Sequence, residues 1–79
     1  MTPAEHHDAL VHIGLSAIAV HKAKAAYMAA QLAYRRTWKV GTPIADSIAA
    51  SEAMREARDL MHAHEGQLDD LIEQYEEQA

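Results

Sequence analysis

Large hydrophobic residues recur every seven positions in each half of the 79-residue chain. This predicted seam consists of Ile13, Val20, Tyr27, Tyr34 and, four positions on, Trp38 in the first half, and Met54, Met61, Leu68 and Tyr75 in the second. The small residues beside it are Ser16, Ala19, Ala23, Ala26, Ala30, Ala33 and Thr37, and then Ala50, Ala53 and Ala57. Such a repeat of large and small residues is typical of two helices in a left-handed coiled coil, because alanine lets the helix axes approach closely.

Two Thr-Pro pairs mark where the two helices begin. Proline is favoured in the first helical turn, and a threonine before it can accept a hydrogen bond from a free backbone N–H. Glu5 follows Thr2 by three residues, as in a capping box, and Thr42-Pro43 comes directly after Gly41, which can adopt the left-handed conformation that ends a helix. The sequence therefore predicts an all-α fold in a single domain of residues 1–79, with a helix over about 3–39, a turn at 40–42 and an antiparallel helix over about 43–77.

Gly66 is the position that could divide the second helix, because a glycine in a helix interior costs about 1 kcal/mol relative to alanine. The seven-residue spacing from Met54 to Tyr75 continues across it without a change of phase. We therefore expect one continuous second helix rather than a third helix after Gly66. In the resulting hairpin, the numbers of two facing residues should add to about 82.

Hydrophobic residues also occur outside the predicted seam of the first helix, at Leu10, Val11, Ile18, Met28 and Leu32. A helix that is apolar on more than one face is usually buried on more than one face. A chain of this size buries little surface by itself, and it has no cysteine for a disulfide. We therefore expect a homo-oligomer, with a four-helix bundle of two hairpins as the simplest closed assembly, or a larger helical oligomer.

Charge is distributed unevenly along the chain, whose net charge is −5. No acidic residue lies between Asp8 and Asp46, and five of the seven basic residues lie there, at Lys22, Lys24, Arg35, Arg36 and Lys39. Basic residues interleaved with aromatic ones could contact nucleic acid. Helical spacing places them on two sides of the helix instead of in one stripe, so we expect solvated flanks that pair with Glu52, Glu56 and Asp59 across the hairpin.

The chain has six histidines, at His6, His7, His12, His21, His62 and His64. The antiparallel register would bring His21 near His62, so a three-histidine metal cluster is a hypothesis, although no Glu-x-x-His pair of the di-iron bundle type is present. Histidines at a subunit interface could make assembly depend on pH between about 5 and 7. We expect surface histidines, with one or two hydrogen-bonded at the seam, and no metal or cofactor.

Catalysis and membrane insertion have little support in the sequence. The serines lie at small-residue positions of predicted helices, and there is no glycine-rich phosphate-binding loop. The longest apolar-rich run, ALVHIGLSAIAV, spans 12 residues, fewer than the roughly 20 that a bilayer requires. The first residues do not resemble a signal peptide. We therefore expect a non-enzymatic, cytoplasmic protein without a membrane partner.

Two families resemble parts of this pattern. The short hairpin with a basic first helix resembles Rop, an RNA-binding four-helix dimer, and the match is one of architecture without a shared motif. Trp38-Lys39-Val40-Gly41 is similar to the Trp-x-Gly turn of Esx-type secreted hairpins, with one additional residue between Trp and Gly. The first resemblance implies a nucleic-acid-binding regulator, and the second implies a secreted helical hairpin.

The function that the sequence favours is protein–protein interaction by a homo-oligomeric helical hairpin. Such a protein could be an adaptor or an inhibitor, of the kind that phages and other mobile elements encode. A Rop-like regulator that binds RNA or DNA through the basic residues of the first helix is the alternative. A histidine-rich metal-binding bundle is the second alternative.

Overall fold

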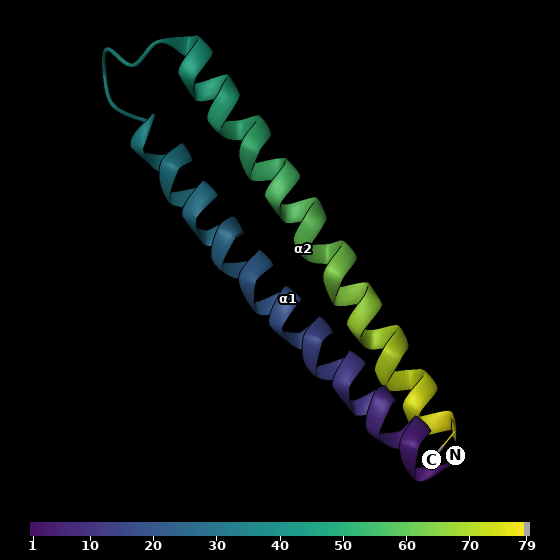
Figure 1. The fold of residues 1–79 in the computed structure, drawn as a ribbon. Coiled ribbons are helices and arrows are strands. Elements are labelled where there is room, and N and C mark those ends of the chain that lie inside the picture. Colours follow the sequence, from purple (N-terminus) through teal and green to yellow (C-terminus); the bar gives the residue numbers. More distant parts are fainter. Residues whose placement is uncertain (79) are drawn as a thin grey trace.

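The computed structural model describes residues 1–78, which form two antiparallel α-helices joined by a short connection (Figure 1). The helices are α1 (Pro3–Arg36) and α2 (Ile44–Gln78), and no strand occurs within the described residues. Both chain ends therefore lie at the same end of a rod that measures 62 × 14 × 12 Å between its Cα atoms. The all-helical hairpin that the heptad spacing predicts is confirmed.

The start of α1 follows the expected capping chemistry. The Thr2 hydroxyl accepts a hydrogen bond from the Glu5 backbone N–H at 3.2 Å, and Pro3 occupies the first helical position. The Thr2 carbonyl accepts the next bond, from the N–H of His6 at 2.9 Å. Thr2 thus satisfies one backbone N–H that helix geometry leaves free, that of Glu5, and its carbonyl accepts the first bond of the helix.

The end of α1 is three residues earlier than the sequence predicts, at Arg36 and not near 39. The N–H groups of Thr37 and Trp38 bond to carbonyls only three residues back, at Tyr34 and Arg35, which tightens the last turn. The Thr37 hydroxyl also donates to the Tyr34 carbonyl at 2.6 Å. Threonine can compete for helix carbonyls in this way, so Thr37 ends the helix before Gly41 is reached.

The connection is correspondingly longer than the predicted turn at 40–42. Gly41 has φ +91°, the left-handed region, but it lies inside the connection and does not cap α1 directly. The N–H of Thr42 bonds to the Lys39 carbonyl at 3.2 Å, and the Pro43 carbonyl accepts the first bond of α2, from Asp46. Pro43 therefore stands just before α2, one position earlier relative to the helix than expected.

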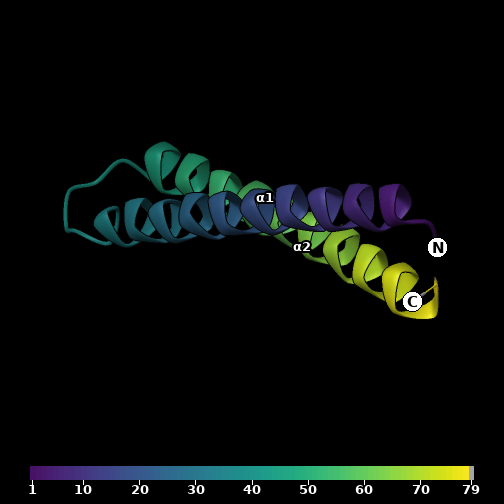
Figure 2. The same ribbon diagram turned by 60° about the horizontal axis from the view of Figure 1, so that its bottom comes forward.

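Helix α2 runs through Gly66 without interruption, as the unbroken heptad phase predicts. Gly66 has open space around its Cα, so no close approach of another element explains the glycine. Seen from the direction of Figure 2, the two helices cross near the middle of the rod. Neither helix has an apolar stretch of the length needed to cross a bilayer, over the residues described.

Replacing Gly41 with alanine should lower the free energy of unfolding by about 1 kcal/mol, because a Cβ strains the left-handed backbone even where space is open. The matched change Gly66→Ala should raise it by about 0.5–1 kcal/mol, because alanine favours the helix interior. Urea unfolding at one fixed protein concentration measures both. Equal effects of the two substitutions would contradict the assignment of Gly41 to the connection.

Candidate interaction surface

The face of α1 that packs on α2 is defined by alternating spacings of four and three residues. Its half-buried and buried members are Ala9, Ile13, Ser16, Val20, Ala23, Tyr27, Ala30, Tyr34 and Thr37. Along this line, large residues at one heptad position alternate with small residues at the other. The corresponding members on α2 are Ser47, Ala50, Met54, Ala57, Met61, His64, Leu68, Leu71 and Tyr75. We call these two lines together the inner seam.

The register of the inner seam is fixed near the connection. The hydroxyl of Thr37 hydrogen-bonds to the hydroxyl of Ser47 at 3.2 Å, so the numbers of facing residues add to about 84, close to the predicted 82. Extended along the hairpin, this register places Met61 level with Ala23 and Tyr27 level with Ala57. In this part of the hairpin a large side chain thus meets a small one, which lets the helices approach closely, whereas toward the chain ends Val20 is level with His64 and Ile13 with Leu71.

Most residues of the predicted seam lie on the inner seam, but Trp38 does not. Its side chain is 69% exposed, because α1 ends at Arg36 and the chain has already left the helix. The indole packs edge-to-face on Tyr34 with ring centroids 5.6 Å apart. Ala26, Ala33 and Ala53 are also exposed, so the small stripe is narrower than the sequence predicts.

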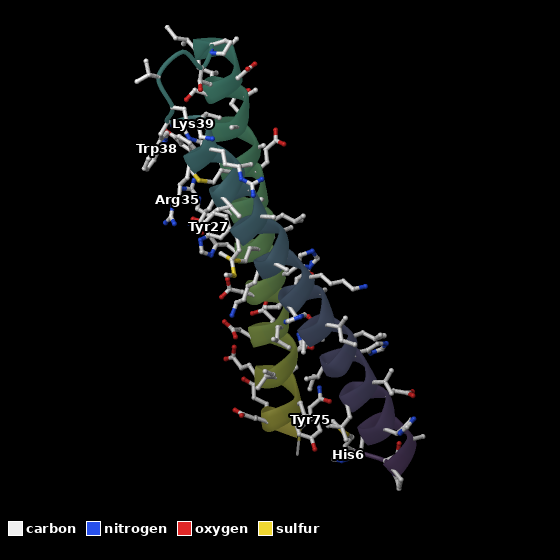
Figure 3. All side chains as sticks on the ribbon, turned by 90° about the vertical axis from the view of Figure 1, so that its left-hand side faces the viewer. His6, Tyr27, Arg35, Trp38, Lys39 and Tyr75 are labelled. Carbon is white, nitrogen blue, oxygen red and sulfur yellow. The ribbon has the colours of Figure 1, made fainter. Side chains whose placement is uncertain are left out.

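The open end of the hairpin is closed by an aromatic contact that the heptad pattern did not reveal. The rings of His6 and Tyr75 lie 5.2 Å apart, and the Tyr75 hydroxyl is 3.2 Å from His6 Nε2 and 3.3 Å from Nδ1 (Figure 3). The hydroxyl can bond to only one of these nitrogens at a time. This contact ties the first turn of α1 to the last turns of α2.

A second apolar line runs along the exposed side of α1, where two of its members, Leu15 and Lys22, also line grooves shared with α2. It has the same alternation of four and three residues and consists of Val11, Leu15, Ile18, Lys22, Ala25, Ala29 and Leu32. All seven are exposed, and Lys22 is the only polar member. We call this line the outer seam. The sequence pattern identified three residues of the outer seam, Val11, Ile18 and Leu32, as apolar residues outside the predicted seam. It did not identify Leu15, Ala25 and Ala29.

Helix α2 has no such second line. The positions on its outer face that match the outer seam are Ala49, Glu52, Glu56, Asp59, Ala63, Gly66, Asp70 and Glu73. These residues are mostly acidic and all exposed. The exposed large hydrophobic residues of α2, Ile44, Ile48, Leu60 and Ile72, do not lie on one such line. The continuous unpartnered apolar line therefore belongs to α1.

An open groove joins the two seams along one side of the hairpin. It has a volume of about 510 Å³, and its lining includes Leu15, Ser16, Ala19 and Leu71. The Ser16 hydroxyl oxygen in its wall is buried and has no hydrogen-bond partner within residues 1–78. Leu15 belongs to both the outer seam and the groove, which makes the apolar surface of α1 continuous.

The basic residues of α1 do not pair with α2 as expected. Within residues 1–78 the ion pairs are Arg58–Asp59 at 3.5 Å and His62–Glu65 at 3.6 Å, and both lie within α2. The expected pairs with Glu52, Glu56 and Asp59 across the hairpin are therefore wrong. Small side chains bring the helices close along the inner seam, while the basic side chains project away from it. Arg35, Trp38 and Lys39 gather at the connection end (Figure 3).

The histidines are spread along the rod. His62 is exposed and His64 is half-buried on the inner seam, and the described residues contain no group of three histidine, aspartate or glutamate side chains that could hold a metal ion. The hypothetical three-histidine cluster is therefore not assembled, because His62 and His64 lie on different faces of α2. Instead His12 and His64 both line the groove.

No protein-family model matches the chain, and neither a curated protein nor a solved structure matches it.

Enlarging Ala23 to leucine should lower the free energy of unfolding by about 1–3 kcal/mol, because Ala23 is buried and level with Met61. Ala26→Leu, three residues away and exposed, should change the hairpin's stability by less than about 0.5 kcal/mol. Thermal unfolding followed by circular dichroism distinguishes them. A larger effect at Ala26 than at Ala23 would contradict the inner seam.

Proposed function

We propose that this protein is a non-enzymatic interaction module that self-associates through α1 and acts on a partner protein as an adaptor or inhibitor. The observation that supports this proposal is the outer seam. Leu15 is 60% exposed, Ile18 53% and Leu32 50%, and they lie on one face of one helix. Contiguous apolar surface of this kind is characteristic of protein–protein contact sites.

The small core of the isolated hairpin gives a second argument for self-association. Only Val20, Ala23 and Met61 are buried among the described residues. Burying a leucine or isoleucine completely contributes about 1.5–3 kcal/mol, so covering half-exposed side chains contributes on the order of 1 kcal/mol each. In a two-fold symmetric contact each such residue is buried once on each copy. The summed burial free energy is therefore large relative to the free energy of unfolding of a small domain.

The acidic outer face of α2 would remain accessible when α1 is covered. Adaptor or inhibitor activity then follows from the division of roles, in which α1 holds the assembly together and α2 presents charge to another protein. Acidic residues at the rim of a contact increase association rates with a basic surface and make them depend on salt.

A nucleic-acid-binding function is the second candidate, and one observation favours it. At the connection end, the exposed indole of Trp38 lies beside Arg35 and Lys39, which combines a stacking surface with positive charge (Figure 3). Lys22 lies on the outer seam and does not join this cluster. The acidic face of α2 opposes the approach of a phosphate backbone, so the first candidate is the stronger one.

The substitution Leu15→Asp should raise the dissociation constant of self-association by at least about 100-fold, because it would bury an unpaired carboxylate in the contact. Ile48→Asp is the matched control, because Ile48 is 53% exposed, close to the 60% of Leu15, but lies on α2. Sedimentation equilibrium measures the mass, and circular dichroism checks that both variants stay helical. A monomeric parent protein, or equal weakening by both substitutions, would contradict the proposal.

If the second candidate is right, Trp38→Ala and Arg35→Gln should each weaken binding to single-stranded RNA or DNA about 10-fold, through lost stacking and lost charge respectively. Lys22→Gln should leave binding almost unchanged, since Lys22 is on another side of α1. Fluorescence anisotropy over a salt series measures the affinity and its salt dependence. Absence of binding at low salt would exclude this function.

A further inference from the structure

We propose that the occupant of the outer seam is a second copy of this chain, docked with its α1 antiparallel to the first. This inference rests on the proposed self-association and adds which surfaces meet and in which direction. The assembly would be a row of four helices, with the two α1 helices in the middle and the two α2 helices outside. This differs from a closed bundle, because the outer and inner seams lie on opposite sides of α1.

The outer seam is asymmetric in side-chain size along its length. Its N-terminal half carries the large residues Val11, Leu15 and Ile18, whereas its C-terminal half has small residues at Ala25 and Ala29 and one large apolar residue, Leu32, at its end. Two such seams can meet in either direction. Their fit differs, because helix packing requires a side chain of one helix to enter a space on the other.

Antiparallel docking places large residues against small ones in both halves of the contact. With Val11 level with Ala29 of the second copy, Leu15 is level with Ala25, and the two-fold axis repeats both pairs. Parallel docking would instead place Ala25 and Ala29 against themselves and leave voids, while the large residues would crowd one another. The inner seam already follows the large-on-small arrangement, so the same chain would use one packing rule on both faces of α1.

The charges at the two ends of the seam favour the same direction. Continuing the alternation of four and three residues places Asp8 at the N-terminal end and Arg36 at the C-terminal end. Neither forms an ion pair within residues 1–78. Antiparallel docking brings Asp8 of each copy to within about one helical turn of Arg36 of the other. Parallel docking brings together like charges at both ends, which is unfavourable.

Lys22 is compatible with this arrangement. In the antiparallel register it is level with Ile18 of the second copy, near the middle of the contact. Its aliphatic stem can cover apolar surface while the ammonium group extends past the edge of the seam into water. Lys22 therefore contributes packing without requiring a buried charge.

Single-cysteine variants test the direction, because the natural chain has no cysteine. Val11→Cys and Ala29→Cys are prepared separately, mixed as full-length proteins and oxidised. The expected product is a disulfide between the two different variants and none in either variant alone. In an antiparallel pair, identical positions lie about 27 Å apart, since 18 residues at 1.5 Å separate 11 from 29. Asp59→Cys, on the outer face of α2, is the control for random collision.

The other outcomes separate the two proposals. Disulfides within each variant alone, at a rate above the Asp59→Cys control, would establish parallel docking and overturn the inference. A dimeric mass without any specific disulfide would place the contact elsewhere and overturn it while leaving self-association intact. A monomeric mass of the parent protein would overturn both.

Charge reversal gives a second readout that needs no disulfide geometry. Asp8→Arg and Arg36→Asp should each weaken the dimer about 2- to 30-fold, as expected for the loss of two rim ion pairs per dimer. The double variant Asp8→Arg/Arg36→Asp restores opposite charges only in the antiparallel arrangement, so it should recover the parent affinity. Absence of recovery in a variant that stays helical would count against antiparallel docking.

Discussion

The packing of large side chains against small ones along the inner seam is the constraint on which the rest of this structure depends. Met61 can lie level with Ala23, and Tyr27 level with Ala57, only in one register. That register brings Thr37 and Ser47 together at one end, while at the other end Tyr75 contacts His6, about one helical turn from the residue that the same register would place level with it. With two helices there is a single mutual contact, so every side chain outside it remains exposed or needs a partner from another molecule.

Thr37 has consequences well beyond one hydrogen bond. Its hydroxyl and its N–H both use the Tyr34 carbonyl, and the helix ends there. Trp38 consequently packs on Tyr34 at the tip of the rod and does not extend the inner seam. The indole of Trp38 is therefore exposed beside basic residues. This arrangement is the reason why nucleic-acid binding is the second candidate function.

The two helices differ in a way that relates the structure to the proposed function. Helix α1 is apolar on opposite sides and carries most of the positive charge, whereas α2 is apolar on one side and acidic on the other. Burial of α1 between two neighbouring helices would explain why it has apolar residues on opposite sides. The same arrangement would leave the acidic faces of α2 as the outer surfaces of the assembly.

The sequence by itself determined the helical hairpin, its approximate register and the continuity of α2 through Gly66, because these follow from heptad phase and local capping. It also indicated that α1 is too apolar for one interface. Only the tertiary structure decided where α1 ends, since Thr37 bonds to both the Tyr34 carbonyl and Ser47 on the other helix. It alone distinguished buried Ala23 from exposed Ala26, excluded cross-hairpin ion pairs within residues 1–78, and placed Ala25 and Ala29 on one outward line with Leu15. Seven-residue spacing gives the phase of the hydrophobic positions along a helix. Which side of that helix contacts a neighbour depends on the packing geometry of both helices.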